Sequence, residues 1–91
     1  MERYMIQAPH TQEDCLRVLD AFQQAGAHFL RTTDWGCYAG DHTSWLVVEA
    51  LDDDDARRMV PAVLRKDARV VRLNKFSPDD IRKLQQETGT L

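Results

Sequence analysis

The chain has 91 residues, of which 43% are hydrophobic and 30% are charged, and this composition is typical of a single globular domain spanning residues 1–91. Its 12 Lys and Arg residues stand against 15 Asp and Glu residues, and the net charge of -3 argues against nucleic acid as a partner. All apolar runs are far shorter than the ~20 residues that a helix needs to cross a bilayer, so we expect no contact with a membrane.

The number of cysteines bears on the cellular compartment, and the chain length bears on the oligomeric state. Cys15 and Cys37 are too few for a disulfide framework, and no charged and apolar leader precedes the predicted fold. We therefore expect reduced thiols and a cytoplasmic location. A domain of this size hides only about two-thirds of the surface that its unfolded chain exposes, so a second copy would add stability. We expect a homodimer.

The first two predicted elements are a strand and a helix. Polar and apolar side chains alternate over residues 3–8, which predicts a strand that Pro9 ends. Thr11 can cap the helix that follows, because its hydroxyl can accept a hydrogen bond from the N–H of Asp14. Apolar residues then recur at helical spacing, and Gly26 is placed to end the helix with a positive φ.

Residues 27–33 and 44–51 are expected to form the second and third strands of a long hairpin. The stretch 34–45, which includes the connection, holds both tryptophans, half of the glycines, one of the two cysteines and one of the three histidines, so we expect a site there. Gly36 and Gly40 leave the register of the hairpin open, because a glycine within a strand often marks a bulge that reverses the faces of the residues beyond it.

The second half begins with an acidic run at residues 52–55, which suits the positive end of a helix. A metal site made from these acids is the alternative, although no calcium-loop pattern accompanies them. Pro61 should kink or split the helix. Residues 69–76 alternate again and predict the fourth strand.

Ser77 is then expected to cap a short C-terminal helix, because a proline and two acidic residues follow it. Ile81 and Leu84 can dock this helix on the body of the protein. We expect the last residues, 88–91, to be frayed.

The order strand, helix, strand, strand, helix, strand predicts an α+β fold of the ferredoxin-like βαββαβ type, with two helices on one face of a four-stranded antiparallel sheet and a short additional C-terminal helix. The residues expected to face the helices are Tyr4, Ile6, Leu30, Leu46, Val48, Val71 and Leu73. The residues expected on the opposite face are Met5, Gln7, Phe29, Arg31, Trp45, Val47, Glu49, Arg72 and Asn74. This mixture predicts a face that is covered by a second subunit, by a ligand or by both.

Three segments carry a resemblance to a known superfamily: the stretch 36–43 (Gly-Cys-Tyr-Ala-Gly-Asp-His-Thr), the pair Val60-Pro61, and the strand 71–76 (Val-Arg-Leu-Asn-Lys-Phe). The whole chain resembles small bacterial proteins of the dimeric α+β-barrel superfamily, which includes muconolactone-isomerase-like and antibiotic-biosynthesis-monooxygenase-like members. The resemblance implies a dimer in which two sheets pack face to face, and small organic ligands that bind between sheet and helices. It supplies no catalytic motif, because a fold alone does not define an activity.

A metal site is one hypothesis for the segment 34–43. Cys37, Asp41 and His42 are the candidate ligands, because thiolate, imidazole and carboxylate groups together suit zinc, nickel or a similar divalent ion. Asp34 lies close to them in sequence, and His10 could approach them in the folded chain. The segment holds neither a C-x-x-C pair nor an H-x₃₋₅-H pair, so no established metal motif supports the hypothesis. Cys15 lies on the apolar stripe of a helix and is expected to be a packing residue.

A small-molecule pocket is the leading hypothesis, and no cofactor is expected. The predicted lining comprises Trp35, Tyr38, His42 and Trp45, with Arg31 and Arg72 on neighbouring strands placed to hold a carboxylate or phosphate group. An ion-paired dimer interface is the alternative for the two arginines.

Whether the protein is an enzyme is left open by the sequence. His42 is the candidate general base of a cofactor-free isomerase or monooxygenase, with Cys37 as a possible nucleophile. Neighbouring residues on an extended strand point to opposite faces, so Asp41 is poorly placed to orient His42.

Overall fold

A computed structural model describes residues 1–87 of the chain. The protein is an α+β fold built on one four-stranded antiparallel sheet with the strand order β2-β3-β1-β4. The strands are β1 (Glu2–Pro9), β2 (Asp34–Trp35), β3 (Thr43–Ala50) and β4 (Arg69–Leu73). The helices are α1 (Cys15–Ala25), α2 (Ala27–Thr32), the 3-10 helix η1 (Cys37–Ala39), α3 (Asp53–Arg58), α4 (Ala62–Arg65) and α5 (Pro78–Glu87).

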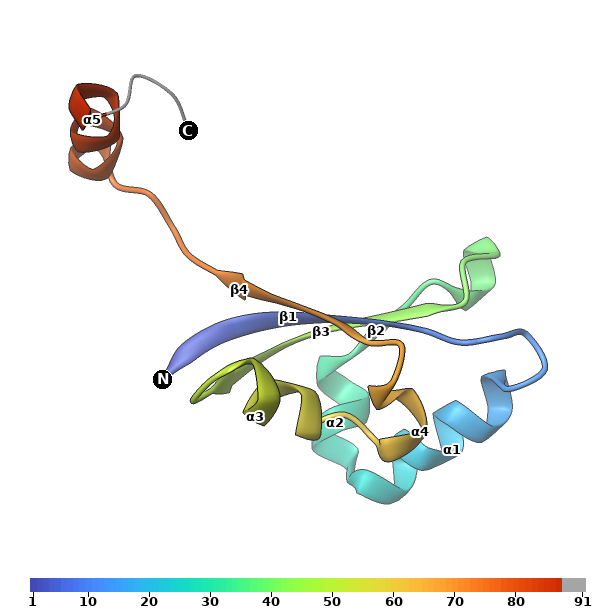
Figure 1. The fold of residues 1–91 in the computed structure, drawn as a ribbon. Helices are drawn as coiled ribbons and strands as arrows, with labels where there is room; N and C mark the ends of the chain where they lie inside the picture. The colour runs from blue at the N-terminus through green and yellow to red at the C-terminus, as the bar shows by residue number, and fades with distance from the viewer. Residues whose placement is uncertain (88–91) are drawn as a thin grey trace.

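Helices α1 to α4 lie against one face of the sheet and leave the other face uncovered (Figure 1). The core forms between this helical layer and the strands, as the alternating pattern of β1 predicts. Its members are Tyr4, Ile6, Ala8, Val18, Phe22, Leu46, Ala50, Ala56, Val60, Leu64 and Ala68. The long strands β1 and β3, which pair along their full length, form the centre of this layer.

The hydrogen bond predicted for the start of the first helix is present, because the N–H of Asp14 donates to the hydroxyl of Thr11 over 3.3 Å. This bond lies in the turn before α1, whose N-cap position is taken by Asp14 without a side-chain cap, so Thr11 as the cap residue is wrong. Gly26 follows the helix with a φ of 130°, a backbone conformation that L side chains rarely adopt.

The predicted second strand over residues 27–33 is wrong, because most of this segment forms α2. Its apolar residues do not alternate strictly, and three good helix formers lie among its six residues. Phe29 packs against the core from the helix, and its carbonyl accepts a 2.6 Å hydrogen bond from the hydroxyl of Thr33. The second strand of the sheet is instead β2, which begins at Asp34 and has only two residues. Phe29 and Arg31 lie on α2 and therefore not on the open face of the sheet.

The expected faces of β4 are also reversed. Opposite residues of an antiparallel pair share a face, and Arg72 lies opposite the buried Tyr4. Val71 and Leu73 therefore lie on the open face beside Met5. A shift of one residue in register is enough to exchange the two faces of a strand, and the sequence of β4 has apolar residues on both.

The open face otherwise has the predicted strand residues. Trp45, Val47 and Glu49 alternate along β3 with the buried Leu46 and the partly buried Val48. The centre of this face is apolar, and Val47 is 44% exposed there.

The acidic run opens a helix, and the proline splits it, as predicted. The carboxylate of Asp52 accepts a 2.8 Å hydrogen bond from the N–H of Asp55 at the start of α3. Pro61 then separates α3 from α4. Among the helices of residues 1–87, none combines the length and the apolar character that crossing a membrane would require.

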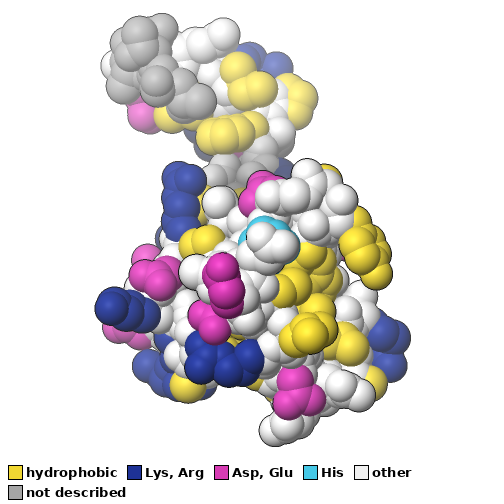
Figure 2. Space-filling view, turned by 90° about the vertical axis from the view of Figure 1, so that its right-hand side faces the viewer, with side chains coloured by type: hydrophobic (Ala, Val, Ile, Leu, Met, Phe, Trp, Pro, Cys, Tyr) yellow, Lys and Arg dark blue, Asp and Glu magenta, His cyan; other side chains and the backbone are white. Residues whose placement is uncertain are grey.

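The last helix has its predicted cap but not its predicted position. The N–H of Asp80 donates to the hydroxyl of Ser77 over 3.1 Å. An extended segment after β4 carries α5 away from the sheet and the other helices, so the expected docking through Ile81, which is 46% exposed, is wrong (Figures 1 and 2). Residues 88–91 lie outside the part of the chain that the structure describes.

Candidate metal centre

Four metal-binding side chains converge at one end of the sheet: His10, Cys15, Cys37 and His42. Each offers one ligand atom, and all four atoms lie within 4.8 Å of one another. His10 follows β1, Cys15 opens α1, Cys37 opens η1 and His42 precedes β3, so four separate segments meet here. All four residues are half-buried, and little histidine surface is visible at this end of the molecule (Figure 2).

The central strand pair brings the two histidines together. Pairing of β1 with β3 continues to Pro9 and Thr43, and one residue further the N–H of His10 donates to the carbonyl of His42 over 2.9 Å. Their ring centroids lie 5.7 Å apart at an interplanar angle of 67°. The sheet register therefore fixes the spacing of the histidines.

A tight loop brings Cys37 to the same place. The N–H of Gly36 donates to the carbonyl of Thr43 over 3.0 Å, and the N–H of Asp41 donates to the carbonyl of Gly36 over 3.0 Å. A Cβ atom on Gly36 would lie 2.6 Å from the carbonyl oxygen of Asp41, so only glycine fits without a shift of the backbone. Cys37 and His42 are thus held near the two ends of one closed loop.

Two separations between ligand atoms are close to the edges of a tetrahedral metal site. The Sγ atoms of Cys15 and Cys37 lie 3.6 Å apart, and Sγ of Cys37 lies 3.5 Å from Nε2 of His10. Zn–S bonds of about 2.3 Å and Zn–N bonds of about 2.0–2.1 Å give tetrahedral edges of roughly 3.8 Å between two sulfurs and roughly 3.5 Å between sulfur and nitrogen. The observed separations lie close to both values.

Each histidine also has a buried ring nitrogen without a protein partner. Nδ1 of His10 and Nδ1 of His42 have no hydrogen-bond partner within the described part of the chain. A buried polar atom that makes no such bond costs about 1–3 kcal/mol. For His10, the nitrogen that approaches the thiol of Cys37 is the other ring atom, Nε2, so an ion bound between them would leave Nδ1 of His10 without a partner.

Burial sets the protonation of the cluster in the absence of metal. It lowers the pKa of His10, and the neighbouring His42 lowers it further. It raises the pKa of Cys37, and the hydrogen bond with Cys15 acts in the same direction. The imidazole of His10 is therefore neutral and able to donate a lone pair, whereas binding of a metal ion has to displace the thiol proton of Cys37.

An aromatic wall shields one side of the cluster. The indole of Trp35 lies 6.0 Å from the ring of His10 in an edge-on arrangement, and Trp35 packs at 4.9 Å on the fully buried Phe22. An apolar shell of this kind restricts solvent access to a metal and orients its ligands. The hydrophobic core therefore continues directly into the cluster.

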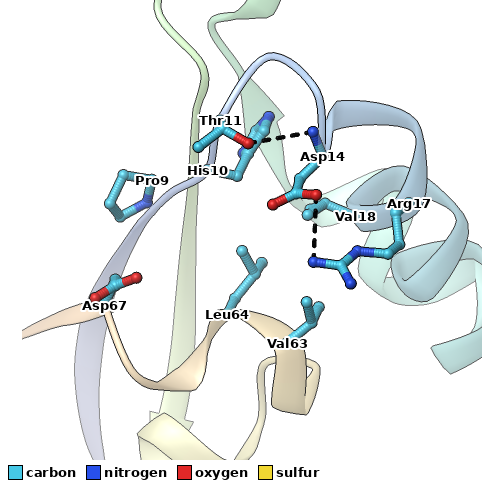
Figure 3. A pocket seen from close by; sticks show the side chains of 9 residues that line it. All are labelled: Pro9, His10, Thr11, Asp14, Arg17, Val18, Val63, Leu64 and Asp67. Atoms are coloured by element: carbon cyan, nitrogen blue, oxygen red, sulfur yellow. Dashed lines mark hydrogen bonds and ion pairs between the residues drawn. The ribbon is translucent and has the colours of Figure 1, made fainter.

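A groove of about 300 Å³ opens on another side (Figure 3). It lies between the end of β1, the start of α1 and helix α4. The residues lining it are Pro9, His10, Thr11, Asp14, Arg17, Val18, Val63, Leu64 and Asp67. Asp14 and Arg17 form an ion pair of 3.3 Å at its edge, so one carboxylate and the only guanidinium of the lining are already paired.

The structure changes the predicted ligand set. Cys37 and His42 lie in the cluster, and His10 approaches them as proposed. Asp41 is exposed and lies outside the cluster, where its carboxylate accepts a 2.6 Å hydrogen bond from the hydroxyl of Thr43. Cys15, which was expected to be a packing residue, places its sulfur 3.6 Å from that of Cys37 and takes the fourth place in the cluster.

A spacing signal for Cys15 was present in the sequence. Four residues separate His10 from Cys15, and four residues separate Cys37 from His42. The two pairs mirror each other as H-x₄-C and C-x₄-H, which differs from the Cys-Cys and His-His pairs of common zinc motifs. This mirrored pattern indicates a four-residue site only when the two pairs are known to lie close together in the folded chain.

The residues predicted to line one organic-ligand pocket are distributed over several surfaces. Trp35 lies on the helix-covered side of the sheet, whereas Trp45, one strand away, lies on the open side against Gly36. Tyr38 is fully exposed on η1, and Arg31 is exposed at the end of α2.

Arg72 completes this predicted set on β4, where it pairs with Glu2 over 3.3 Å. Its face of the sheet differs from that of Trp45, and Arg31 lies on a helix. The expected arrangement of the two arginines on neighbouring strands around Trp45 is therefore wrong.

The fold and the cluster together define an α+β protein with a Cys₂His₂ ligand set at the end of its sheet. Comparisons of the chain with protein-family models, with curated proteins and with solved structures found no match. The functional assignment therefore has to come from the chemistry of the four side chains.

Proposed function

We propose that the protein binds one zinc ion, or a similar divalent transition-metal ion, through His10, Cys15, Cys37 and His42. The observation that carries this proposal is the convergence of their four ligand atoms within 4.8 Å of one another, with the Cys15–Cys37 and Cys37–His10 separations close to tetrahedral edges. Nδ1 of His42 supports it as well, because this atom is buried and has no hydrogen-bond partner in the described part of the chain.

Ligand chemistry favours zinc among the candidate ions. Two thiolates and two imidazoles in a tetrahedral arrangement suit zinc, whereas magnesium and calcium prefer oxygen ligands. Four protein ligands complete a tetrahedral shell and leave no position for a water molecule, which is typical of structural rather than catalytic zinc. The ion would connect the start of α1 and the loop of η1 to the end of the sheet.

The test is a competition titration of the reduced protein with zinc and a chromophoric chelator. We expect one zinc per chain. His42→Ala should weaken zinc binding by more than about 100-fold, because removal even of an outer-shell partner costs 10–100-fold. His28→Ala is the matched control, because His28 is exposed on α2 and should leave the affinity unchanged.

Two results would contradict the metal proposal. One is a wild-type protein that does not compete with the chelator at all. The other is equal loss of zinc affinity in His42→Ala and His28→Ala, which would show that the metal binds to surface histidines without a defined site. Thermal melting of both variants in chelator verifies that each remains folded.

The proposed assembly is a ferredoxin-like homodimer. The strand order β2-β3-β1-β4 supports the ferredoxin-like arrangement. The uncovered sheet face supports the dimer, because Met5, Val47 and Val71 place adjacent apolar side chains at its centre and an exposed apolar patch commonly marks an interface. A second copy is the occupant expected from the marginal size of the domain.

Two valines of similar exposure test the dimer. Val47 is 44% exposed on the open face, and Val63 is 42% exposed on α4. Val47→Asp should convert the dimer to a monomer in sedimentation experiments, because an unpaired charge would be buried. Val63→Asp should leave the assembly unchanged. A wild-type monomer at micromolar concentration would contradict the proposed dimer.

A small organic ligand is the second candidate function, and the groove beside His10 favours it. Its floor is apolar at Val18 and Leu64, and the carboxylate of Asp67 stands at its rim (Figure 3). This lining favours a small ligand with an apolar body and a positive group. Isomerase or monooxygenase chemistry with His42 as base stays a prediction, and metal coordination by His42 would compete with it.

A further inference from the structure

We infer that Cys15 and Cys37 also form a reversible disulfide that replaces the metal ion, which makes the site a thiol redox switch. This inference rests on the proposed zinc site and adds its regulation. The observation behind it is that the two sulfurs are in contact within the cluster, 3.6 Å apart, although the cysteines are 22 residues apart in sequence. Both thiols are free and half-buried.

The geometry requires little movement for this reaction. The sulfurs lie 3.6 Å apart, and a disulfide bond is about 2.05 Å long, so the two side chains have to approach by only about 1.5 Å. Cys15 is the first residue of α1 and Cys37 is the first residue of η1, so the two sulfurs come from two separate elements. Rotation of these side chains can supply the approach.

A peroxide is the oxidant that the proposal requires. The thiolate of one cysteine attacks the peroxide and becomes a sulfenic acid, while the O–O bond breaks and one hydroxide leaves. The second thiolate attacks the sulfenic sulfur, forms the S–S bond and expels a second hydroxide. Two electrons pass from the sulfurs to the peroxide, and the metal ion keeps its oxidation state. A dithiol reductant returns the two electrons and regenerates the thiols.

Oxidation removes half of the ligand set. Only His10 and His42 remain as donors, and two imidazoles do not complete a zinc shell, so the ion should leave. The disulfide connects α1 to the loop of η1, the same two segments that the ion connects. The loop therefore stays attached in both states, and the fold should survive the loss of the metal.

The experiment uses the full chain loaded with zinc and treated with hydrogen peroxide. Zinc release is followed with a chromophoric chelator, and the disulfide is located by peptide mapping without reduction. We expect one zinc released for each Cys15–Cys37 disulfide in a monomeric chain. Addition of dithiothreitol and zinc should restore the loaded protein.

The outcomes separate this inference from the metal proposal. Absence of zinc binding in the reduced protein overturns both. If zinc binds, the inference alone is overturned by a cysteine that stops at sulfenic or sulfinic acid, by a disulfide between two chains, or by an intrachain disulfide that forms without releasing zinc.

Two single variants and one control sharpen the assignment. Cys15→Ser and Cys37→Ser should each abolish the intrachain disulfide and leave a sulfenic acid on the remaining cysteine, which a dimedone label detects. His28→Ala should form the disulfide and release zinc as the wild type does. Equal dimedone labelling of the wild type and the two serine variants would contradict the pairing of the two sulfurs.

Discussion

Two adjacent regions of the molecule are held together by different chemistry. The core under the sheet consists of apolar side chains such as Ile6 and Phe22, which are fully buried and need no further partner. The cluster at the end of the same sheet consists of two thiols and two imidazoles, with two buried nitrogens unpartnered by the protein. The first region is complete in the polypeptide alone, whereas the second would be completed by the proposed ion.

This difference makes the two regions experimentally separable. Removal of apolar area should destabilise the protein by the same amount with and without metal. Removal of a ligand should destabilise it only when metal is available, because an ion stabilises the native state through its affinity for that state. Trp35, which contacts both Phe22 and His10, is the point at which the two regions meet.

The largest effect should come from the core. Phe22→Ala should lower the free energy of unfolding by about 3–5 kcal/mol, because a large buried side chain leaves a cavity. Urea denaturation measures this loss, and it should be similar in zinc and in a chelator. A loss confined to the zinc-loaded protein would show that core and cluster are not independent.

The next effect should come from the cluster. Cys15→Ser should abolish the stabilisation by zinc that urea denaturation detects in the wild type, which amounts to about 2.7 kcal/mol when free zinc is 100 times its Kd. In a chelator, the variant and the wild type should have similar stability, since serine preserves the shape of the side chain. A variant as strongly stabilised by zinc as the wild type would remove Cys15 from the ligand set.

A smaller effect should separate two glycines of the loop. Gly36→Ala places a methyl group 2.6 Å from the carbonyl oxygen of Asp41 and should cost about 1–3 kcal/mol while displacing Cys37 and weakening zinc binding. Gly40 has a φ of 87° but open space around its Cβ position. Gly40→Ala should lower the free energy of unfolding by only about 1–2 kcal/mol, the cost of a left-handed backbone conformation for an L residue, and it should leave zinc affinity nearly unchanged. Equal zinc affinity in both variants would contradict the role of Gly36 in placing Cys37.

The smallest effect concerns pH. In the metal-free protein the lowered pKa of His10 means that the unfolded chain takes up a proton first, so stability should fall as the pH drops below about 6.5. The raised pKa of Cys37 means that the unfolded chain loses its proton first, so stability should also fall above about pH 8.5.

Bound zinc should prevent the loss of stability that the metal-free protein shows at alkaline pH. Metal binding requires thiolates, so its affinity should increase with pH and fall in acid as protons compete for the ligands. Thermal melting across this pH range, with zinc and with chelator, tests both limbs. A metal-loaded protein that loses stability above about pH 8.5 as the metal-free protein does would contradict thiolate ligation.

The elements with strong local signals could be predicted from the sequence. Alternation in β1 and β3, the hydrogen bond between Asp14 and Thr11 and the split at Pro61 each depend on a few neighbouring residues, and the structure confirms them. The prediction of a strand in the segment of α2 was wrong. Its short apolar pattern suits either a helix or a strand, and packing of Phe29 against the core decides between them.

Three of the four members of the cluster could be inferred from the sequence. Cys37 and His42 lie in one loop, so their proximity is local, and His10 was expected to approach them. Cys15 depends on how α1 packs against the sheet, so the sequence indicated only its place in the apolar stripe of the helix. Asp41 was favoured by its neighbourhood in sequence, although its carboxylate is used by Thr43 within the loop.

Cobalt substitution tests the central claim most directly, because the visible spectrum of Co²⁺ reports its coordination geometry and its thiolate ligands. Titration of the reduced protein with Co²⁺ should give one ion per chain, the intense visible bands of a tetrahedral ion and the near-ultraviolet bands of cobalt–thiolate bonds, all displaced by zinc. Weak bands of an octahedral ion without thiolate absorption, or no spectral change at all, would contradict a metal centre formed by His10, Cys15, Cys37 and His42.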